Sequence, residues 1–167
     1  MRQLIVVVIV ALTATLLTET AASARGDGWE FLDQSDLTTT ACGTEILESI
    51  VANGEFAKFA VDADGVLHFV LVTGVFKVRV TNTATGATVL VNASGTGHDA
   101  LLYPNGDFLF TSSGPSIIVL TPEEAAQTGL PELFLASGNM TLLFRADGSA
   151  EVQRRVGHLT DLCAVLT

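Results

Sequence analysis

Val75-Phe76-Lys77-Val78-Arg79-Val80 is the stretch that decides the class of fold. Phe76, Val78 and Val80 fall on one face of an extended chain, and Lys77 and Arg79 fall on the other. A period of two residues is typical of a β-strand with one face against the core and the other in water. Residues 75–80 therefore predict a strand, and the rest of the chain is interpreted outward from it.

Turn signals flank this strand and recur along the chain. Asn-Gly and Asp-Gly tolerate the positive φ that tight hairpin turns require, so each predicts a reversal of the chain. We expect turns at Asn53-Gly54, Asp64-Gly65, Thr85-Gly86, Asn105-Gly106 and Asp147-Gly148, with further breaks at Gly74, Ser94-Gly95, Gly114, Gly138 and Gly157. Most intervals are about eight to twelve residues, the strand spacing of barrels and sandwiches.

The segments between the turns read as strands. Residues 66–72 and 117–120 are nearly continuous apolar runs, which indicates strands covered on both faces or strands at an intermolecular contact. Further candidates are residues 45–51, 56–61, 87–93, 100–103, 107–111, 133–136, 140–145 and 150–156. Counted separately, they give about eleven short strands. The expected fold is all-β, an antiparallel meander closing into an up-and-down barrel because closure removes exposed edges; a two-sheet sandwich is the alternative.

Two segments look helical. Residues 121–127 begin with a potential Thr121 cap, place Pro122 at the first helical position and put two acids in the first turn. Residues 159–166 predict a second short turn, which would carry Cys163.

The first 24 residues have the layout of a secretory signal. Arg2 precedes the apolar run 4–12, and Ala22-Ser23-Ala24 offers small residues for cleavage near Ala24. The run is too short for a transmembrane anchor, which needs about 20 apolar residues. We expect a secreted protein with a lead-in at residues 25–41, from which Trp29 and Phe31 pack onto the body, and a single β domain at residues 42–167.

The net charge limits the classes of partner that the protein can bind, and the cysteines predict a disulfide. Without residues 1–24 the chain has 7 Lys and Arg (8 − 1) against 17 Asp and Glu (18 − 1), a net charge of −10. Such a surface repels nucleic acid and anionic lipid. Cys42 and Cys163 are two cysteines in an oxidising destination, and they predict one disulfide across a loop of about 120 residues.

The sequence marks no catalytic, cofactor or metal site. His68, His98 and His158 lie far apart and in no ligand spacing. Residues 94–99 bring Ser, His and Asp together, but a catalytic triad normally draws its members from separate segments, so a loop at the mouth of the sheet is expected there. Asp62-Ala63-Asp64-Gly65 is better explained as a turn than as a calcium loop.

The aromatic residues carry the remaining functional signal. A barrel of about eight strands has an interior just wide enough to be filled by side chains or to hold one small ligand. A filled core is the favoured interpretation. If a pocket exists, its lining would come from Phe69, Phe76, Tyr103, Phe108, Phe110 and Phe144.

Residues 81–86 (Thr-Asn-Thr-Ala-Thr-Gly), residues 92–95 (Asn-Ala-Ser-Gly) and the terminal Asp161-Leu162-Cys163-Ala164 resemble a group of small exported actinobacterial proteins with no assigned function. The resemblance covers roughly residues 42–166 and implies no catalytic residues. Lipocalins are a more distant comparison. A lipocalin carries Gly-x-Trp on its first strand, whereas here Gly28 directly precedes Trp29.

The sequence therefore predicts a secreted, non-enzymatic β domain that acts as a binding or surface-interaction module. Its partner would be another protein or a small apolar molecule. The leading alternative is a calyx-type carrier of a small apolar ligand, and a hydrolase or other enzyme comes third.

Overall fold

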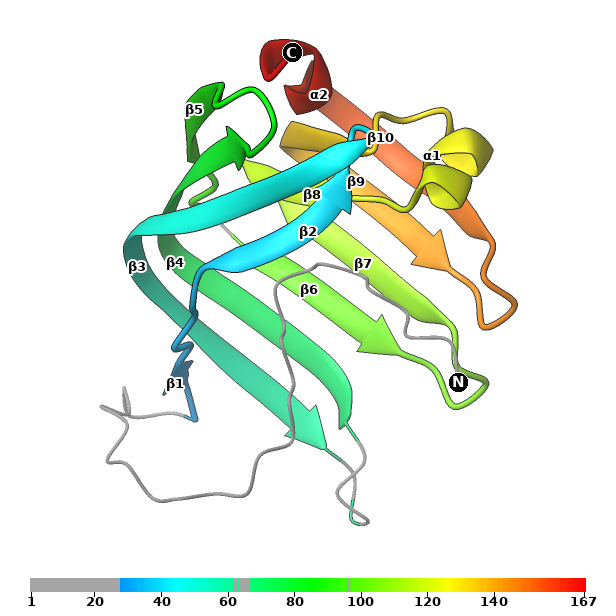
Figure 1. Cartoon of the computed structure of the whole chain (residues 1–167). Coiled ribbons are helices and arrows are strands. Elements are labelled where there is room, and N and C mark those ends of the chain that lie inside the picture. The colour runs from blue at the N-terminus through cyan, green and yellow to red at the C-terminus, as the bar shows by residue number, and fades with distance from the viewer. Residues whose placement is uncertain (1–27, 62, 64–66, 96) are drawn as a thin grey trace.

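The computed structural model describes residues 28–61, 63, 67–95 and 97–167. These residues form ten strands and two short helices, which confirms the all-β class (Figure 1). The strands are β1 (Glu30–Phe31), β2 (Leu37–Ala41), β3 (Thr44–Val61), β4 (Leu67–Asn82), β5 (Thr88–Asn92), β6 (Gly97–Leu102), β7 (Phe108–Ser113), β8 (Ser116–Val119), β9 (Leu133–Phe144) and β10 (Ala150–Asp161), and the helices are α1 (Pro122–Thr128) and α2 (Leu162–Val165). The predicted signal segment lies outside the described residues.

All ten strands belong to one antiparallel sheet. Its main path runs β1-β3-β4-β6-β7-β9-β10, with β2 added to β3, β5 to β4 and β8 to β9. The path follows chain order, as a meander requires. Within the described part of the chain no pairing joins β1 to β10, so the sheet is open and not a closed barrel.

Four of the expected breaks are bends inside continuous strands, so their interpretation as strand ends was wrong. β3 continues through Asn53-Gly54 and β4 through Gly74. In the same way β9 continues through Gly138 and β10 through Gly157. The strand pairs predicted on either side of Asn53-Gly54, Gly74 and Gly138 are therefore single long strands, and the strand predicted at residues 150–156 continues past Gly157.

These glycines allow two backbones to approach closely at the bends. Gly74 has φ 142°, and a Cβ on it would lie 2.2 Å from the carbonyl oxygen of Gly54. Gly138 and Gly157 are register partners whose added Cβ atoms would lie 2.2 and 2.1 Å from backbone carbonyl oxygens of the opposite strand. Only a residue without a side chain fits such a contact.

The bends bring two parts of the sheet face to face (Figure 1). A buried cluster joins β3, β4 and β5 on one side to β8, β9 and α2 on the other. Its buried members are Ala41, Ile46, Phe76, Val78, Val80, Val91, Ala93, Val119, Leu133, Leu162 and Leu166. A second cluster, centred on Phe110, Phe134 and Leu142, fills the space between β7, β8, β9 and α1.

Three of the predicted tight turns are confirmed. The amide nitrogens of Gly86, Gly106 and Gly148 donate to carbonyl oxygens three or four residues earlier, at 2.8 to 2.9 Å. These turns join β4 to β5, β6 to β7 and β9 to β10. The turn predicted at Asp64-Gly65 lies outside the described residues.

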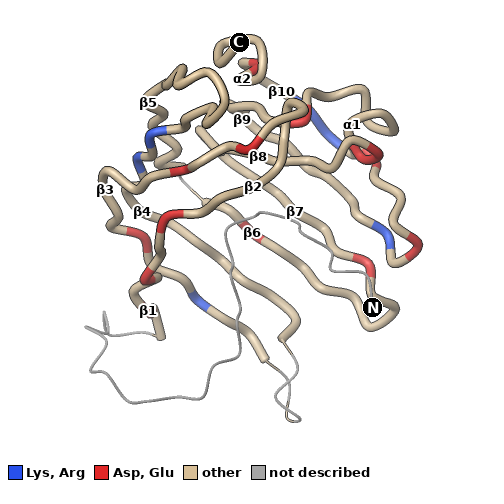
Figure 2. Tube along the Cα trace, viewed as in Figure 1, with Lys and Arg blue, Asp and Glu red and all other residues tan. Residues whose placement is uncertain are grey.

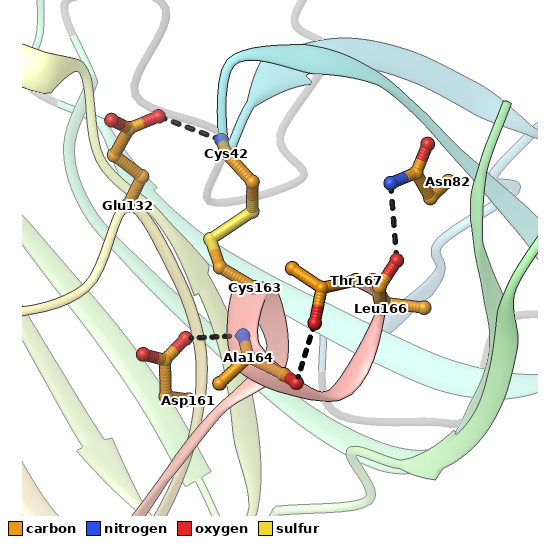
Figure 3. Close-up of a disulfide and its surroundings, with 8 residues drawn as sticks. All are labelled: Cys42, Asn82, Glu132, Asp161, Cys163, Ala164, Leu166 and Thr167. Carbon is orange, nitrogen blue, oxygen red and sulfur yellow. Dashed lines mark hydrogen bonds between the residues drawn. A yellow bond between two sulfur atoms is a disulfide. The ribbon is translucent and has the colours of Figure 1, made fainter. Parts of the chain in front are cut away.

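The predicted disulfide is confirmed. The Cα atoms of Cys42 and Cys163 lie 5.4 Å apart, and the bond ties the β2–β3 turn to α2 (Figure 3). Beside it, Glu132 Oε2 accepts a hydrogen bond from the Cys42 amide at 2.7 Å. Asn82 Nδ2 donates to the Leu166 carbonyl oxygen at 3.1 Å, so the C-terminal turn is held from both sides.

The helical turn predicted at residues 121–127 is confirmed, and of the one predicted at residues 159–166 only residues 162–165 are helical, because residues 159–161 belong to β10. α1 begins with a complete capping box. Thr121 Oγ1 accepts from the Glu124 amide at 3.2 Å, and Glu124 Oε2 accepts from the Thr121 amide at 2.8 Å. α2 contains Cys163 and is capped by Asp161. Neither helix among the described residues has the length and apolar character needed to cross a membrane.

The lead-in packs onto the sheet. β1 pairs with β3 at Ala57 and Phe56, and the Phe31 ring meets the Phe56 ring edge to face with centroids 5.7 Å apart. In addition, Asn53 Nδ2 donates a hydrogen bond to the Leu32 carbonyl oxygen at 2.7 Å. The chain from residue 30 to residue 41 therefore follows the outer edge of β3.

Candidate functional site

A small cavity lies between the two facing parts of the sheet. Its volume is about 50 Å³. The lining comes from the lead-in and from β3, β4, β6, β7 and β8, through Gln34, Glu55, Val72, Phe76, Ala93, His98, Phe110, Ser116 and Ile117. The space is enough for a few water molecules and far below the 300 to 1,000 Å³ of pockets that hold drug-sized ligands.

His98 and Ser116 form the closest polar contact of this cavity. His98 Nε2 lies 2.7 Å from Ser116 Oγ. Burial lowers the pKa of His98, and a hydrogen bond to the Pro115 backbone opposes this effect. The imidazole is therefore favoured in its neutral form, which can accept a hydrogen bond from the serine hydroxyl.

Gln34 and Glu55 form the second polar contact. Gln34 Nε2 donates to Glu55 Oε2. Burial raises the pKa of Glu55, and the hydrogen bond from Gln34 opposes this rise. Gln34 Oε1 is buried and has no hydrogen-bond partner in the described part of the chain, and the same is true of the Oγ of Ser112, the register partner of His98. The cavity is thus a polar spot within an apolar interior.

This arrangement lacks the features of a hydrolase site. A serine nucleophile must reach its substrate, and Ser116 is only 1% exposed. A triad also needs an acid that orients the histidine, and among the described residues no carboxylate bonds to His98. The His98–Ser116 contact therefore serves to satisfy two buried polar groups.

The aromatic residues predicted as pocket lining are placed in three different surroundings. Phe76 and Phe110 line the cavity. Phe108 and Phe144 pack on each other with ring centroids 5.9 Å apart. Phe69 lies on the opposite face of the sheet from the buried Val70, and Tyr103 is 41% exposed. The six residues do not meet in one pocket.

The histidines also differ from the sequence expectation. His98 lies in β6, so the loop expected at residues 94–99 was wrong for this residue; among the described residues of that stretch only Ser94 and Gly95 have irregular backbone. His68 lies in β4 and His158 in β10. No group of three His, Cys, Asp or Glu suited to a metal ion occurs among the described residues.

The outer face of the sheet carries a row of apolar side chains. Phe69 on β4 pairs with Leu101 on β6, Leu101 with Leu109 on β7, and Leu109 with Leu143 on β9. All four are partly exposed, whereas the next residue in register on each strand is buried in the core on the other face: Val70, Ala100, Phe110 and Leu142. We call Phe69, Leu101, Leu109 and Leu143 the outer apolar row.

A shallow groove of about 400 Å³ borders this row. Its lining combines Leu109 and Leu143 with Tyr103, Asn105, Asp107, Thr141 and Gln153. Asn105 Nδ2 donates to Asp107 Oδ2 at 3.0 Å, and Asp107 Oδ1 accepts from the Ala146 amide at 2.9 Å. Asn105 and Asp107 are thus engaged within the protein, and Leu109 and Leu143 supply apolar lining to the groove.

Sequence reasoning missed Gln34, Glu55 and Ser116. Glu55 had a signal, because it shares its strand face with the buried Ala57 and so points to the interior. Gln34 belongs to a lead-in without a period, and its position over the cavity depends on contacts distant in sequence. The outer apolar row was visible as separate apolar residues, but its register was not.

Comparison with known proteins gives no relative for this chain. No protein-family model, curated protein or solved structure matches it. The cavity and the outer face therefore carry the functional argument.

Proposed function

We propose that this chain is an exported, non-enzymatic module that binds another protein through its outer apolar row. The row carries the proposal, since it places four large apolar side chains in register on a face of the sheet away from the core. In monomeric soluble proteins, contiguous exposed apolar patches larger than a few hundred Å² often mark an interaction site.

The composition of this face resembles that of a protein interface. Such interfaces have an apolar centre, enriched in tyrosine, inside a polar rim. Here Leu109 and Leu143 lie at the centre and Tyr103 beside them, while Asn105, Asp107 and Gln153 form part of the rim. The disulfide fits export, because such bonds persist in oxidising compartments.

Two other functions have less support. A calyx-type carrier needs a cavity that encloses its ligand, and the interior cavity of about 50 Å³ is too small for that. An enzyme needs titratable groups that substrate can reach, and Ser116 is buried.

The experiment compares two variants in binding to extracellular proteins of the source culture. Leu109→Thr with Leu143→Thr introduces β-branched residues, which strands favour, into β7 and β9 and removes the apolar centre. Leu90→Thr on β5, at a position that is 61% exposed, is the control. We expect the double variant to lose a binding partner that the wild type and the control both retain, and hydrogen exchange to show protection of β7 and β9 in the wild-type complex.

Two outcomes would contradict the proposal. One is equal binding by the wild type and the double variant, which would remove the outer face from the function. The other is a small molecule that co-purifies with the protein in native mass spectrometry, which would favour a carrier.

A further inference from the structure

The two ends of the sheet are open edges. β1 begins the strand path and β10 ends it, and within the described residues β10 pairs with β9 alone. Within the described residues β2 likewise pairs with β3 alone, and a groove of about 490 Å³ separates its residues 37–40 from residues 119–123, which do not pair with it. An open strand edge presents backbone N–H and C=O groups that can pair with another strand.

The edge at β10 is basic and exposed on both faces. Residues 153–158 are six consecutive exposed residues, and they include Arg154, Arg155 and His158. Neither arginine forms an ion pair in the described part of the chain, where the one ion pair joins Arg145 to Glu151. Val156, at the middle of this stretch, is 55% exposed.

The opposite edge is acidic. Glu30, Asp33 and Asp36 are exposed on the segment that follows β3 from β1 to β2. Asp36 is fixed there, since its Oδ1 accepts a hydrogen bond from the Ile50 amide at 2.8 Å. Figure 2 shows the basic stretch on β10 and the acidic residues beside β1 and β2 at separate ends of the sheet.

Charges on edge strands often serve to keep edges apart. Edge charges keep two molecules apart only where the edges that meet carry charge of the same sign, because like charges repel and opposite charges attract. Here the two open edges carry opposite charges, so a contact between different ends is attractive.

We propose that this protein associates with copies of itself head to tail, with the β10 edge of one molecule pairing along the acidic β1–β2 edge of the next. The contact joins two different surfaces, so it does not close as a two-fold dimer and builds chains or rings. This inference goes beyond the proposed function and does not depend on the outer apolar row.

The test uses charge reversal at each edge of the oxidised protein. Arg154→Glu with Arg155→Glu makes both edges acidic, and Asp33→Lys with Asp36→Lys makes both edges basic. In sedimentation velocity at low salt, we expect the wild type to form species larger than dimers as concentration rises. Each variant alone should stay monomeric, and an equimolar mixture of the two should assemble again, because each then finds an edge of opposite charge.

The control is Lys77→Glu with Arg79→Glu, which makes the same change in net charge on exposed residues of β4. It should assemble like the wild type, with a midpoint concentration within about threefold, whereas the edge variants should shift it by more than about tenfold. Recovery in the mixture also shows that both edge variants are folded.

Three results would overturn the inference. The wild type could be monomeric at all concentrations, the control could lose assembly as fully as the edge variants, or the mixture could remain monomeric. Leu109→Thr with Leu143→Thr should assemble normally, so failure of this inference is distinguishable from failure of the proposed function.

Discussion

Gly138 and Gly157 face each other across β9 and β10 with φ angles of 128° and 123°. Each backbone occupies the space that a side chain on the other would need. This paired contact lets both strands bend at the same point, and the bend folds one part of the sheet over the other.

Gly157→Ala should therefore destabilise the protein. The added Cβ would lie 2.1 Å from the Ser137 carbonyl oxygen, so the strands must separate. We expect a loss of about 3 kcal/mol in the free energy of unfolding, from steric overlap added to the cost of positive φ. Urea denaturation measures it.

Gly148→Ala is the matched control. Gly148 has φ 89°, but nothing lies within 4 Å of its added Cβ, so only the conformational cost of about 1 kcal/mol remains. Equal losses for the two variants would show that the close approach at the bend does not matter.

Removing the disulfide should cost more than either glycine change. Cys42 and Cys163 are separated by 121 residues, and the chain-entropy model assigns about 4 to 5 kcal/mol to a loop of this length. Cys42→Ser with Cys163→Ser should lower the urea midpoint accordingly, and the wild type in reductant should behave in the same way. A variant as stable as the oxidised wild type would contradict this account.

Stability should fall as pH rises towards neutrality, because of a buried acid. Glu48 is 1% exposed, neither of its carboxylate oxygens has a hydrogen-bond partner among the described residues, and burial raises its pKa from 4.5 to about 7. The folded protein therefore holds a proton that the unfolded chain releases. The stabilisation is complete below pH 4.5, where both states are protonated, and is lost as pH rises through about 7.

Glu48→Gln should remove the part of this dependence that Glu48 causes, whereas Glu55, whose pKa burial also raises, keeps its own part. A shift from 4.5 to about 7 corresponds to about 3 kcal/mol, so the variant should be more stable than the wild type by about that amount at pH 8. Denaturation between pH 4 and pH 8 measures both. Glu45→Gln, at an exposed position of the same strand, should keep the wild-type pH profile, and a wild-type slope in Glu48→Gln would refute the assignment.

His98 acts in the opposite direction. Burial lowers its pKa, so its contribution to stability is present above the ordinary pKa of 6.5 and is lost as pH falls through the folded value. Because His98 is present in both proteins, it does not affect the difference in stability between the wild type and Glu48→Gln.

The N-terminal cap of α1 should stabilise that helix and leave the sheet unaffected. Thr121→Ala removes the side chain that accepts from the Glu124 amide, and the loss of such a cap costs about 1 kcal/mol. Hydrogen exchange of the α1 amides should become faster, while the β4 amides stay protected. Thr121→Ser keeps the hydroxyl and should exchange like the wild type; faster exchange in both variants would argue against the cap.

Part of this structure could be predicted from the chemistry of short sequence segments. The alternation at residues 75–80, the turns at Gly86, Gly106 and Gly148, and the cap at Thr121 depend on residues a few positions apart, and all occur as expected. The disulfide could also be predicted from the sequence, because two cysteines allow only one pairing.

Distinguishing a bend from a turn needed contacts that are distant in sequence. A glycine with positive φ ends a strand when the chain reverses and bends it when a partner strand continues alongside, and Gly74 and Gly138 are of the second kind. The same holds for the cavity at His98 and Ser116 and for the register of the outer apolar row.

The amino-acid sequence alone thus determined the strand class, the tight turns and the covalent link, since propensity, φ preference and cysteine count are properties of short segments. The folded chain decided which strands are continuous, which polar groups share the interior, and that the sheet stays open with oppositely charged edges. Those features depend on which distant backbones come within hydrogen-bond reach, and this is a property of the assembled sheet.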